Sequence, residues 1–303
     1  MSENKILTLF IPKDYYFSEA MEVIQRGKND PINLIKQGEF IRLINLYERN
    51  ILIGVSRIEE TLNIRILNEI ITSDVSIQLS GIITRLFGLD DPLLGSSSDF
   101  GLPYDQNLNS LVTVHGYLSV FEAAIQTIIG QLISANVANL LRERFVRKFG
   151  GYIVYNDEKY FSFPTPLILG SLDIEQIQDI GISKIKSQAI LNIANEFAKN
   201  NLEEVLTNLE DLKKVREILT NLYGIGKWTS DWISLRALRK FEVVPSGDLI
   251  IRKAFSWYFK HQFLLSSKEV DVIAQNFHPY GGSLAYRIMY AYIKSLRSRL
   301  ESK

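Results

Sequence analysis

The chain has 303 residues, of which 46% are hydrophobic and 22% are charged, so it is long enough to bury a large core in two or three domains. It contains no cysteine, which excludes disulfides, thiolate zinc sites and iron–sulfur clusters. Its formal net charge is +0, so any affinity for nucleic acid has to come from local clusters of basic residues.

The first hundred residues have the pattern of a small mixed α/β domain. Apolar, β-branched runs alternate with short polar segments, as in antiparallel strands joined by hairpins. The expected elements are a strand at 6–11, a helix at 17–26, strands at 40–47, 51–58 and 62–67, and a helix at 76–87. A loop rich in glycine, serine and aspartate follows. We place a domain boundary in this loop, which gives domains 1–105 and 106–303.

From Ser119 onward, apolar residues recur at helical spacing, and the second region is expected to be all-α. Residues 152–163 are interpreted as a polar, aromatic connector. The expected helices cover residues 121–132, 135–148, 184–197, 202–207, 215–222, 227–240, 249–259, 267–277 and 283–300. The fold class is therefore α+β, with an N-terminal antiparallel β-sheet domain and flanking helices followed by an all-α region.

The first two of these helices carry local signals. Gly130 lies on the first helix at a cost of about 1 kcal/mol, so a neighbouring group is expected to approach closely there. On residue pattern alone, Leu132 is one more core leucine of that helix. The second helix, capped by Ser134, is expected to end in solvated basic residues. Its inward-facing side chains should be Val137, Leu140, Leu141 and Phe145, and its basic residues are Arg142, Arg144, Arg147 and Lys148.

A helix-hairpin-helix is the most informative pattern. One helix stops at Gly224-Ile225-Gly226, and the next begins at once with Trp228 and Trp232 on one face. Glycines let the backbone come close to a ligand, and the second helix offers unpaired N–H groups and a positive dipole end, which suit a phosphate. Lys227, in the first turn, is unfavourable there unless an anion lies nearby. The alternative is a glycine C-cap followed by a solvated lysine.

A carboxylate begins the next helix. The loop Pro245-Ser246-Gly247 leads to Asp248, directly before the apolar run Leu249-Ile250-Ile251. A helix cap is a sufficient role for this aspartate. Together, the hairpin, the Trp-bearing helix, the loop and Asp248 resemble the helix-hairpin-helix DNA glycosylase superfamily, whose signature ends in a catalytic aspartate. Within that superfamily the chain is most similar to the 3-methyladenine DNA glycosylase II type, over roughly residues 112–300.

The resemblance implies a cleft between two helical subdomains, with Asp248 as the catalytic residue. Leu132 would fill the space that the flipped base leaves, and aromatic residues of the first segment would be able to reach the base pocket. The base pocket would contain Trp228, Trp232 and Tyr280, and the DNA contacts would come from Gln131, Leu132, Gly224, Ile225, Gly226 and Lys227.

The chemistry follows from the residue types. An enzyme that acts on a glycosidic bond must flip the nucleotide into a pocket, where aromatic rings stack on the base. An alkylated purine is cationic and a good leaving group, so one carboxylate can suffice to stabilise the sugar cation and orient or deprotonate water. Bifunctional superfamily members carry a Schiff-base lysine at the position of Trp228. Lys227 lies about 100° away around the helix, which favours a monofunctional hydrolase.

Three functions stay open at this point. The first is a monofunctional glycosylase for alkylated purines such as 3-methyladenine and 7-methylguanine. The second is a glycosylase, or glycosylase/lyase, for another lesion such as 8-oxoguanine or hypoxanthine. In the third, a non-catalytic helix-hairpin-helix protein binds DNA and Asp248 is only a cap. Core packing is the alternative role for Trp228 and Trp232.

The expected partner is double-stranded DNA with damaged bases, bound by a monomer. No cofactor is expected to be required and no metal site is expected, because His115, His261 and His278 lack ligand spacing. A monovalent cation on the hairpin carbonyl oxygens is compatible with the resemblance.

No apolar run approaches the roughly 20 residues of a membrane span, and the first residues lack the features of a signal peptide. We therefore expect a cytoplasmic location, with the nucleoid included in a prokaryote.

Overall fold

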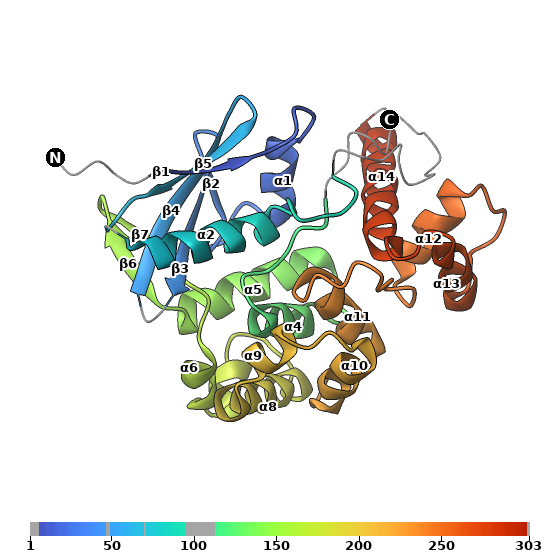
Figure 1. Ribbon diagram of the computed structural model, residues 1–303. Helices are drawn as coiled ribbons and strands as arrows, with labels where there is room; N and C mark the ends of the chain where they lie inside the picture. Colours follow the sequence, from blue (N-terminus) through green and yellow to red (C-terminus); the bar gives the residue numbers. More distant parts are fainter. Residues whose placement is uncertain (1–5, 47–48, 70, 95–112, 302–303) are drawn as a thin grey trace.

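The computed structural model describes residues 6–46, 49–69, 71–94 and 113–301. Three groups of elements surround the middle of the molecule: a sheet with two helices, a layer of helices beneath it, and a C-terminal group of helices beside both (Figure 1). The boundary that the sequence predicts between residues 105 and 106 lies outside the described residues, so the division into two domains stays a prediction.

The N-terminal part is a five-stranded antiparallel sheet in the order β1-β5-β4-β3-β2. Its strands are β1 (Ile6–Phe10), β2 (Leu34–Lys36), β3 (Glu39–Leu46), β4 (Arg49–Ile58) and β5 (Thr61–Ile66). Helices α1 (Phe17–Ile24) and α2 (Ser73–Leu86) share a hydrophobic cluster with the sheet. The strands and helices expected from the sequence are confirmed here. The three-residue β2 was missed, because so short a run carries no period.

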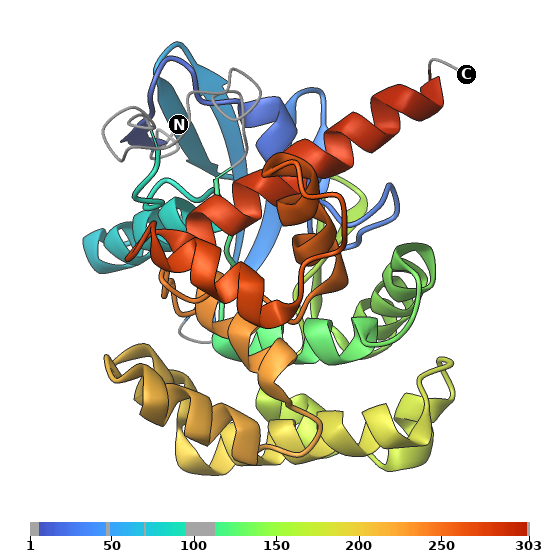
Figure 2. The same cartoon turned by 90° about the vertical axis from the view of Figure 1, so that its right-hand side faces the viewer.

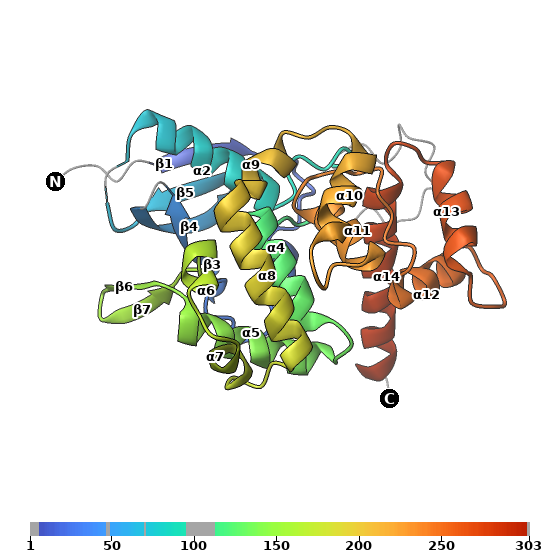
Figure 3. The same cartoon turned by 90° about the horizontal axis from the view of Figure 1, so that it is seen from below.

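The rest of the chain is mainly helical. A central group contains α4 (Val120–Gly130), α5 (Ala135–Phe149), α6 (Pro166–Gly170), α7 (Ile174–Gln178), α8 (Lys184–Asn200), α9 (Leu202–Thr207), α10 (Leu212–Asn221) and α11 (Lys227–Arg236), and a C-terminal group contains α12 (Leu249–Tyr258), α13 (Ser267–Gln275) and α14 (Gly281–Glu301). Helix α4 packs against α8 (Figure 3), and α14 lies across the C-terminal group (Figure 2). The α+β fold is confirmed.

The second region is not all-α, because residues 152–163 contain a β-hairpin where a connector was expected. Strands β6 (Tyr152–Tyr155) and β7 (Glu158–Phe161) are antiparallel. Asn156 and Asp157 between them both have positive φ, 49° and 63°, as in the two-residue turns that match the twist of paired strands. Tyr160 packs with Ile41 and Leu43 of β3, so the hairpin attaches the helical region to the sheet.

Helix α4 is buried and connects the sheet to the other helices. Ser119 caps it by accepting a hydrogen bond from the Glu122 amide. The Glu122 carboxylate pairs with Arg42 of β3 at 2.6 Å, and both side chains are buried. Breaking such a pair by removing one partner costs about 3–5 kcal/mol. Arg42 therefore fixes α4 relative to the sheet.

Helix α5 differs from expectation in three side chains. Leu141 and Phe145 are buried, but Val137 and Leu140 are each 46% exposed. The Arg142 guanidinium folds back onto α4, where Nη2 donates to the carbonyl oxygen of Gln126 at 2.8 Å. A Cβ at Gly130 would lie 2.5 Å from Nη2 of Arg142. The close approach expected at Gly130 is therefore made by Arg142, which was expected to be solvated.

Candidate active site

The two glycines of the hairpin between α10 and α11 differ in backbone conformation and in their surroundings. Gly224 has φ +88°, and a Cβ there would lie 2.6 Å from Cβ of Ala189 on α8, so both its conformation and its packing require glycine. Gly226 precedes α11 with an ordinary φ of −95°, and nothing lies within 4 Å of where its Cβ would be. Ile225 is buried between them. The turn is thus anchored at Gly224 and Ile225 and open at Gly226.

The side chain of Lys227 has a partner within the protein. Its Nζ lies 2.6 Å from Oδ2 of Asp231, one turn further along α11, and Oδ1 of Asp231 lies 3.0 Å from Arg216. Asp231 is buried, so it needs this compensation. An anion does lie near Lys227, as expected, but Asp231 supplies it, and the lysine by itself does not indicate a bound phosphate.

The segment after α4 is held in place around an exposed leucine. Nε2 of Gln131 donates to the Gly224 carbonyl at 3.1 Å and to Thr229 Oγ1 at 2.9 Å, so Gln131 connects α4 to the hairpin. Leu132 has φ +56° and a relative exposure of 103%. The core position that residue pattern alone favours for Leu132 is wrong. A fully exposed leucine on a fixed, left-handed backbone is unfavourable unless another surface covers it.

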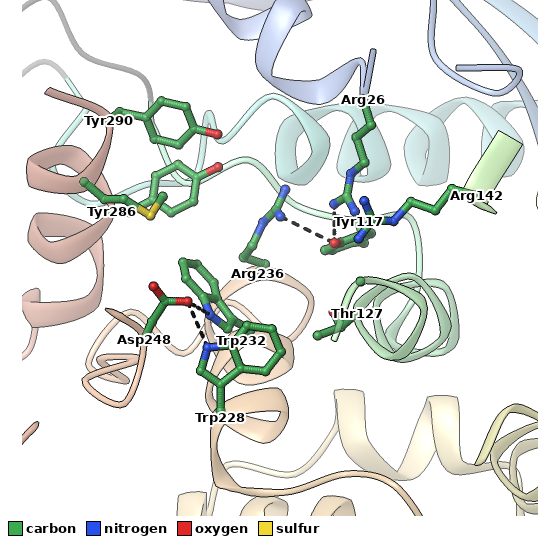
Figure 4. Close-up of a pocket in the computed structure, with 12 residues that line it drawn as sticks. Arg26, Tyr117, Thr127, Arg142, Trp228, Trp232, Arg236, Asp248, Tyr286 and Tyr290 are labelled. Carbon is green, nitrogen blue, oxygen red and sulfur yellow. Dashed lines mark hydrogen bonds between the residues drawn. The ribbon is translucent and has the colours of Figure 1, made fainter. Parts of the chain in front are cut away.

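The Asp248 carboxylate accepts four hydrogen bonds. Oδ1 accepts from the backbone amides of Ile250 and Ile251 at 2.7 and 3.3 Å, which is the expected cap of α12. Oδ2 accepts from the indole Nε1 of Trp228 at 2.8 Å and of Trp232 at 3.2 Å (Figure 4). The capping role uses only one oxygen. The other is fixed by two residues of the hairpin's second helix, so Asp248 is more than a cap.

These groups line a cavity of about 230 Å³. The lining residues come from four helices and from loops. Helix α11 contributes Trp228, Trp232 and Arg236, and α14 contributes Tyr286, Met289 and Tyr290. Helices α4 and α5 contribute Thr127, Gly130 and Arg142, and the loops contribute Arg26, Tyr117 and Asp248. Tyr280 does not line this cavity; it packs, partly buried, against the C-terminal core. The resemblance allows aromatic residues of the N-terminal region to reach the pocket, but among the described residues of that region the one that lines the cavity is Arg26.

Tyr117 forms the inner wall of the cavity with arginines on two sides. Its hydroxyl accepts a hydrogen bond from Arg26 and another from Nη1 of Arg236 at 3.4 Å. The guanidinium carbons of these arginines lie 4.7 and 4.6 Å from the ring centre. Burial by itself would raise the pKa of Tyr117, but the charges of Arg26, Arg236 and Arg142 and the bond from Arg26 lower it to about 8.

Sequence reasoning missed most of this wall. Arg236 lies four residues after Trp232 and eight after Trp228, so helical spacing alone places it on their face. Arg26, Tyr117 and Arg142 carry no such signal, because they reach the cavity from separate elements.

The sequence model of the HhH-GPD superfamily base excision DNA repair protein matches residues 125–276, about half of the chain. The chain belongs to this superfamily. It is 24% identical over 301 residues to a DNA-3-methyladenine glycosylase of Bacillus subtilis (strain 168), which covers 95% of this chain and 98% of the relative. It is 27% identical over 140 residues to DNA-3-methyladenine glycosylase 2 of Escherichia coli (strain K12), with 46% of this chain and 49% of the relative covered.

Solved structures share this fold over more than nine tenths of the chain. A 3-methyladenine DNA-glycosylase from Archaeoglobus fulgidus superposes with a TM-score of 0.79 at 23% identity, covering 94% of this chain and 98% of the other. An 8-oxoguanine glycosylase/lyase from Clostridium acetobutylicum superposes with a TM-score of 0.69 at 17% identity, with 96% and 98% covered. Proteins named for different lesions thus share this fold, so the lesion has to be argued from the side chains of the cavity.

Within residues 6–46, 49–69, 71–94 and 113–301, no helix is long and apolar enough to cross a bilayer. In the same part of the chain, no three His, Asp or Glu side chains group in a way that could hold a metal ion. The monovalent cation on the hairpin stays a prediction, and the Gly224 carbonyl there already accepts a hydrogen bond from Gln131.

Proposed function

We propose that the protein is a monofunctional DNA glycosylase of base excision repair that flips out alkylated purines, such as 3-methyladenine and 7-methylguanine, and hydrolyses their N-glycosidic bond. The observation that carries this proposal is the Asp248 carboxylate, which two indole N–H groups hold at the wall of an aromatic cavity beside the hairpin. The names of the relatives from Bacillus subtilis and Escherichia coli support the same lesion class.

The cavity has the composition that a flipped base requires. Trp228 and Trp232, both partly exposed, contribute aromatic surface, and stacking on such rings stabilises a base by about 1–3 kcal/mol. That gain is comparable to the few kcal/mol that unstacking the nucleotide costs. A cationic alkylated base is also attracted to the faces of the rings. Trp228 and Trp232 therefore have two uses, as pocket walls and as donors that aim the carboxylate.

Asp248 acts on the sugar through its charge. A carboxylate has about four lone-pair sites, and all four hydrogen bonds that would fill them are present on Asp248. Taking a proton from water would require one of these donors to leave. Stabilisation of the positive charge that grows on the sugar requires no rearrangement, which is the condition for strong electrostatic catalysis. We therefore assign Asp248 to charge stabilisation in preference to general-base catalysis.

Duplex DNA would bind across the hairpin and the exposed leucine. The open face at Gly226 lets a phosphate approach the amino end of α11. Leu132 projects from a segment that Gln131 holds against the hairpin. An apolar side chain in that position can occupy the gap that the flipped nucleotide leaves in the stack. Gln131 thus acts as a positioning residue for Leu132 and the hairpin.

The cavity contains no candidate for a Schiff-base lysine among its described lining residues. Trp228 occupies the position of that lysine in bifunctional members, and Lys227 pairs with Asp231 outside the lining. This supports hydrolysis without strand cleavage. We further propose that the protein acts as a monomer on double-stranded DNA, without a required cofactor, in the cytoplasm or nucleoid.

A release assay with defined duplexes tests the proposal. Duplexes that carry 3-methyladenine, hypoxanthine or 8-oxoguanine are incubated with excess protein, and the free base and the strand are measured separately. We expect release of 3-methyladenine with the abasic strand intact. Release of 8-oxoguanine with strand cleavage would support the second candidate function, and binding without any release would support a non-catalytic DNA-binding protein.

A further inference from the structure

The cavity has opposite charges at its two ends. Asp248 and the two indoles lie on one side, and Arg26, Tyr117 and Arg142 lie on the other, with Arg236 between them (Figure 4). Burial, followed by the charge of Arg26, lowers the pKa of Arg142, but a guanidinium is not deprotonated in proteins, so Arg142 remains charged. A base attached to a sugar beside Asp248 would extend toward the arginines.

This arrangement conflicts with a cationic base unless a negative charge is added. Like charges a few ångströms apart repel strongly in a site from which water is excluded. Two carboxylates face this end, and they do not balance the three arginines. Glu122 of α4 pairs with Arg42 at 2.6 Å, and Asp30, which accepts from the amides of Arg26 and Ile32, offsets at most one of the three charges. Asp248 is held at the far side. Among the described groups, the acidic ones that remain are the phenols of Tyr117, Tyr286 and Tyr290.

We propose that Tyr117 is a specificity-determining residue whose phenolate supplies the counter-charge for a cationic base among the three arginines. The inference rests on the proposed function and deepens it. Entry of the cationic base favours the phenolate, and the phenolic proton passes to solvent. When Tyr117 is protonated, the end of the cavity that contains Arg26, Arg142 and Arg236 disfavours a cationic base and accepts a neutral one.

The position of Tyr117 fits this role better than that of Tyr290. Its hydroxyl accepts from both Arg26 and Arg236, and such bonds favour the ionised form. Its pKa of about 8 is close to physiological pH. Burial, and then the neighbouring phenol of Tyr286, raise the pKa of Tyr290 well above its ordinary value, so Tyr290 stays protonated.

The first test is the pH profile of release by the wild type and Tyr117→Phe under single-turnover conditions, with protein in excess over DNA but below the concentration that saturates binding. The substrates are a duplex with 3-methyladenine, whose positive charge comes from alkylation, and a duplex with the neutral 1,N6-ethenoadenine, each corrected for release without enzyme. With a pKa of about 8, the phenolate fraction, and with it the wild-type release of 3-methyladenine, should rise about tenfold between about pH 7 and about pH 9. In Tyr117→Phe the rise should be absent.

Three controls separate charge from structure. Tyr152→Phe removes a hydroxyl from an exposed residue of β6 that does not line the cavity and should keep the wild-type profile. Binding to an abasic duplex, which places no base in the pocket, should not change with Tyr117→Phe. Arg26→Gln keeps a donor to the Tyr117 hydroxyl but removes a charge, so it should move the profile to higher pH without abolishing it.

A spectroscopic titration gives a readout that does not depend on activity. Phenolate absorbance of the free protein should show one group titrating near pH 8 that is absent in Tyr117→Phe and present in Tyr152→Phe. If the wild type releases 3-methyladenine but Tyr117→Phe keeps the same profile, or if no phenol titrates below about pH 9.5, the inference is wrong while the proposed function stands. If the wild type releases no 3-methyladenine at any pH, the proposed function fails, and the inference fails with it.

Discussion

Replacing Asp248 by asparagine tests the proposed catalytic group with little change in shape. Asparagine caps helices about as well as aspartate, so sequence alone predicts a stability within a few tenths of a kcal/mol of the wild type. The structure changes that expectation. An amide has one oxygen and one NH₂ group, so either the backbone amides of Ile250 and Ile251 or the indoles of Trp228 and Trp232 lose their acceptor. At about 0.5–1.5 kcal/mol for each bond, the free energy of unfolding should fall by about 1–3 kcal/mol.

The effect on catalysis should be larger than the effect on stability. Loss of a preorganised charge that faces a developing sugar cation should cost about 3–5 kcal/mol, or about 10²–10⁴ in the rate of base release. Binding of an abasic duplex should be equal or tighter, because a carboxylate that repels phosphates is removed.

The assay combines urea unfolding with single-turnover release of 3-methyladenine at a temperature where the variant is fully folded. A matched control is Asp211→Asn, because Asp211 caps α10 through the Lys213 and Lys214 amides and does not line the cavity. Asp211→Asn should keep both stability and activity. A folded Asp248→Asn protein that releases base at nearly the wild-type rate would refute the assignment and leave Asp248 as a cap and an anchor for the indoles.

Three further outcomes are expected. Borohydride should not trap the protein on lesion DNA, because Trp228 occupies the lysine position; trapping that Lys227→Ala abolishes would contradict this. Leu132→Ala should leave the unfolding midpoint unchanged, because the side chain is fully exposed. It should slow base release from duplex DNA more than from single strands. An equal loss of release on both substrates would show that Leu132 does not fill the gap left by the flipped nucleotide. Gly224→Ala should destabilise the protein by roughly 1–3 kcal/mol, because Gly224 has a positive φ and its Cβ would contact Ala189. Gly226→Ala should fold normally, because there is open space around Gly226, and should weaken DNA binding. Equal stability of the two variants would contradict these roles of the glycines.

Sequence patterns were sufficient where a short segment fixes its own structure. The strands β3, β4 and β5 follow from alternating and β-branched runs, and α4 and α5 follow from helical spacing with Ser119 and Ser134 as caps. The hairpin and the start of α12 at Asp248 follow from glycine and capping rules in the same way. These features depend on neighbours within a few residues, which is the range that local propensity and periodicity describe.

Periodicity gave wrong results where a helix stops or where the chain reverses. Leu132 continues the apolar spacing of α4, but the helix ends at Gly130, and the leucine points into solvent. Residues 152–161 form a hairpin because Asn156 and Asp157 accept left-handed angles and Tyr160 finds a packing surface on the sheet. Neither the exact end of a helix nor a packing partner more than a hundred residues away is encoded in local spacing.

The sequence by itself determined the α+β fold, the hairpin and the carboxylate at the start of α12. Only the tertiary structure decided what surrounds that carboxylate. Arg26 follows α1, Tyr117 precedes α4 and Arg142 belongs to α5, and no spacing rule connects these positions. Their meeting at one cavity depends on how α4 is fixed against the sheet through the buried pair of Arg42 and Glu122. The charge of the pocket is therefore set by long-range packing of elements, whereas each element is set by its own residues.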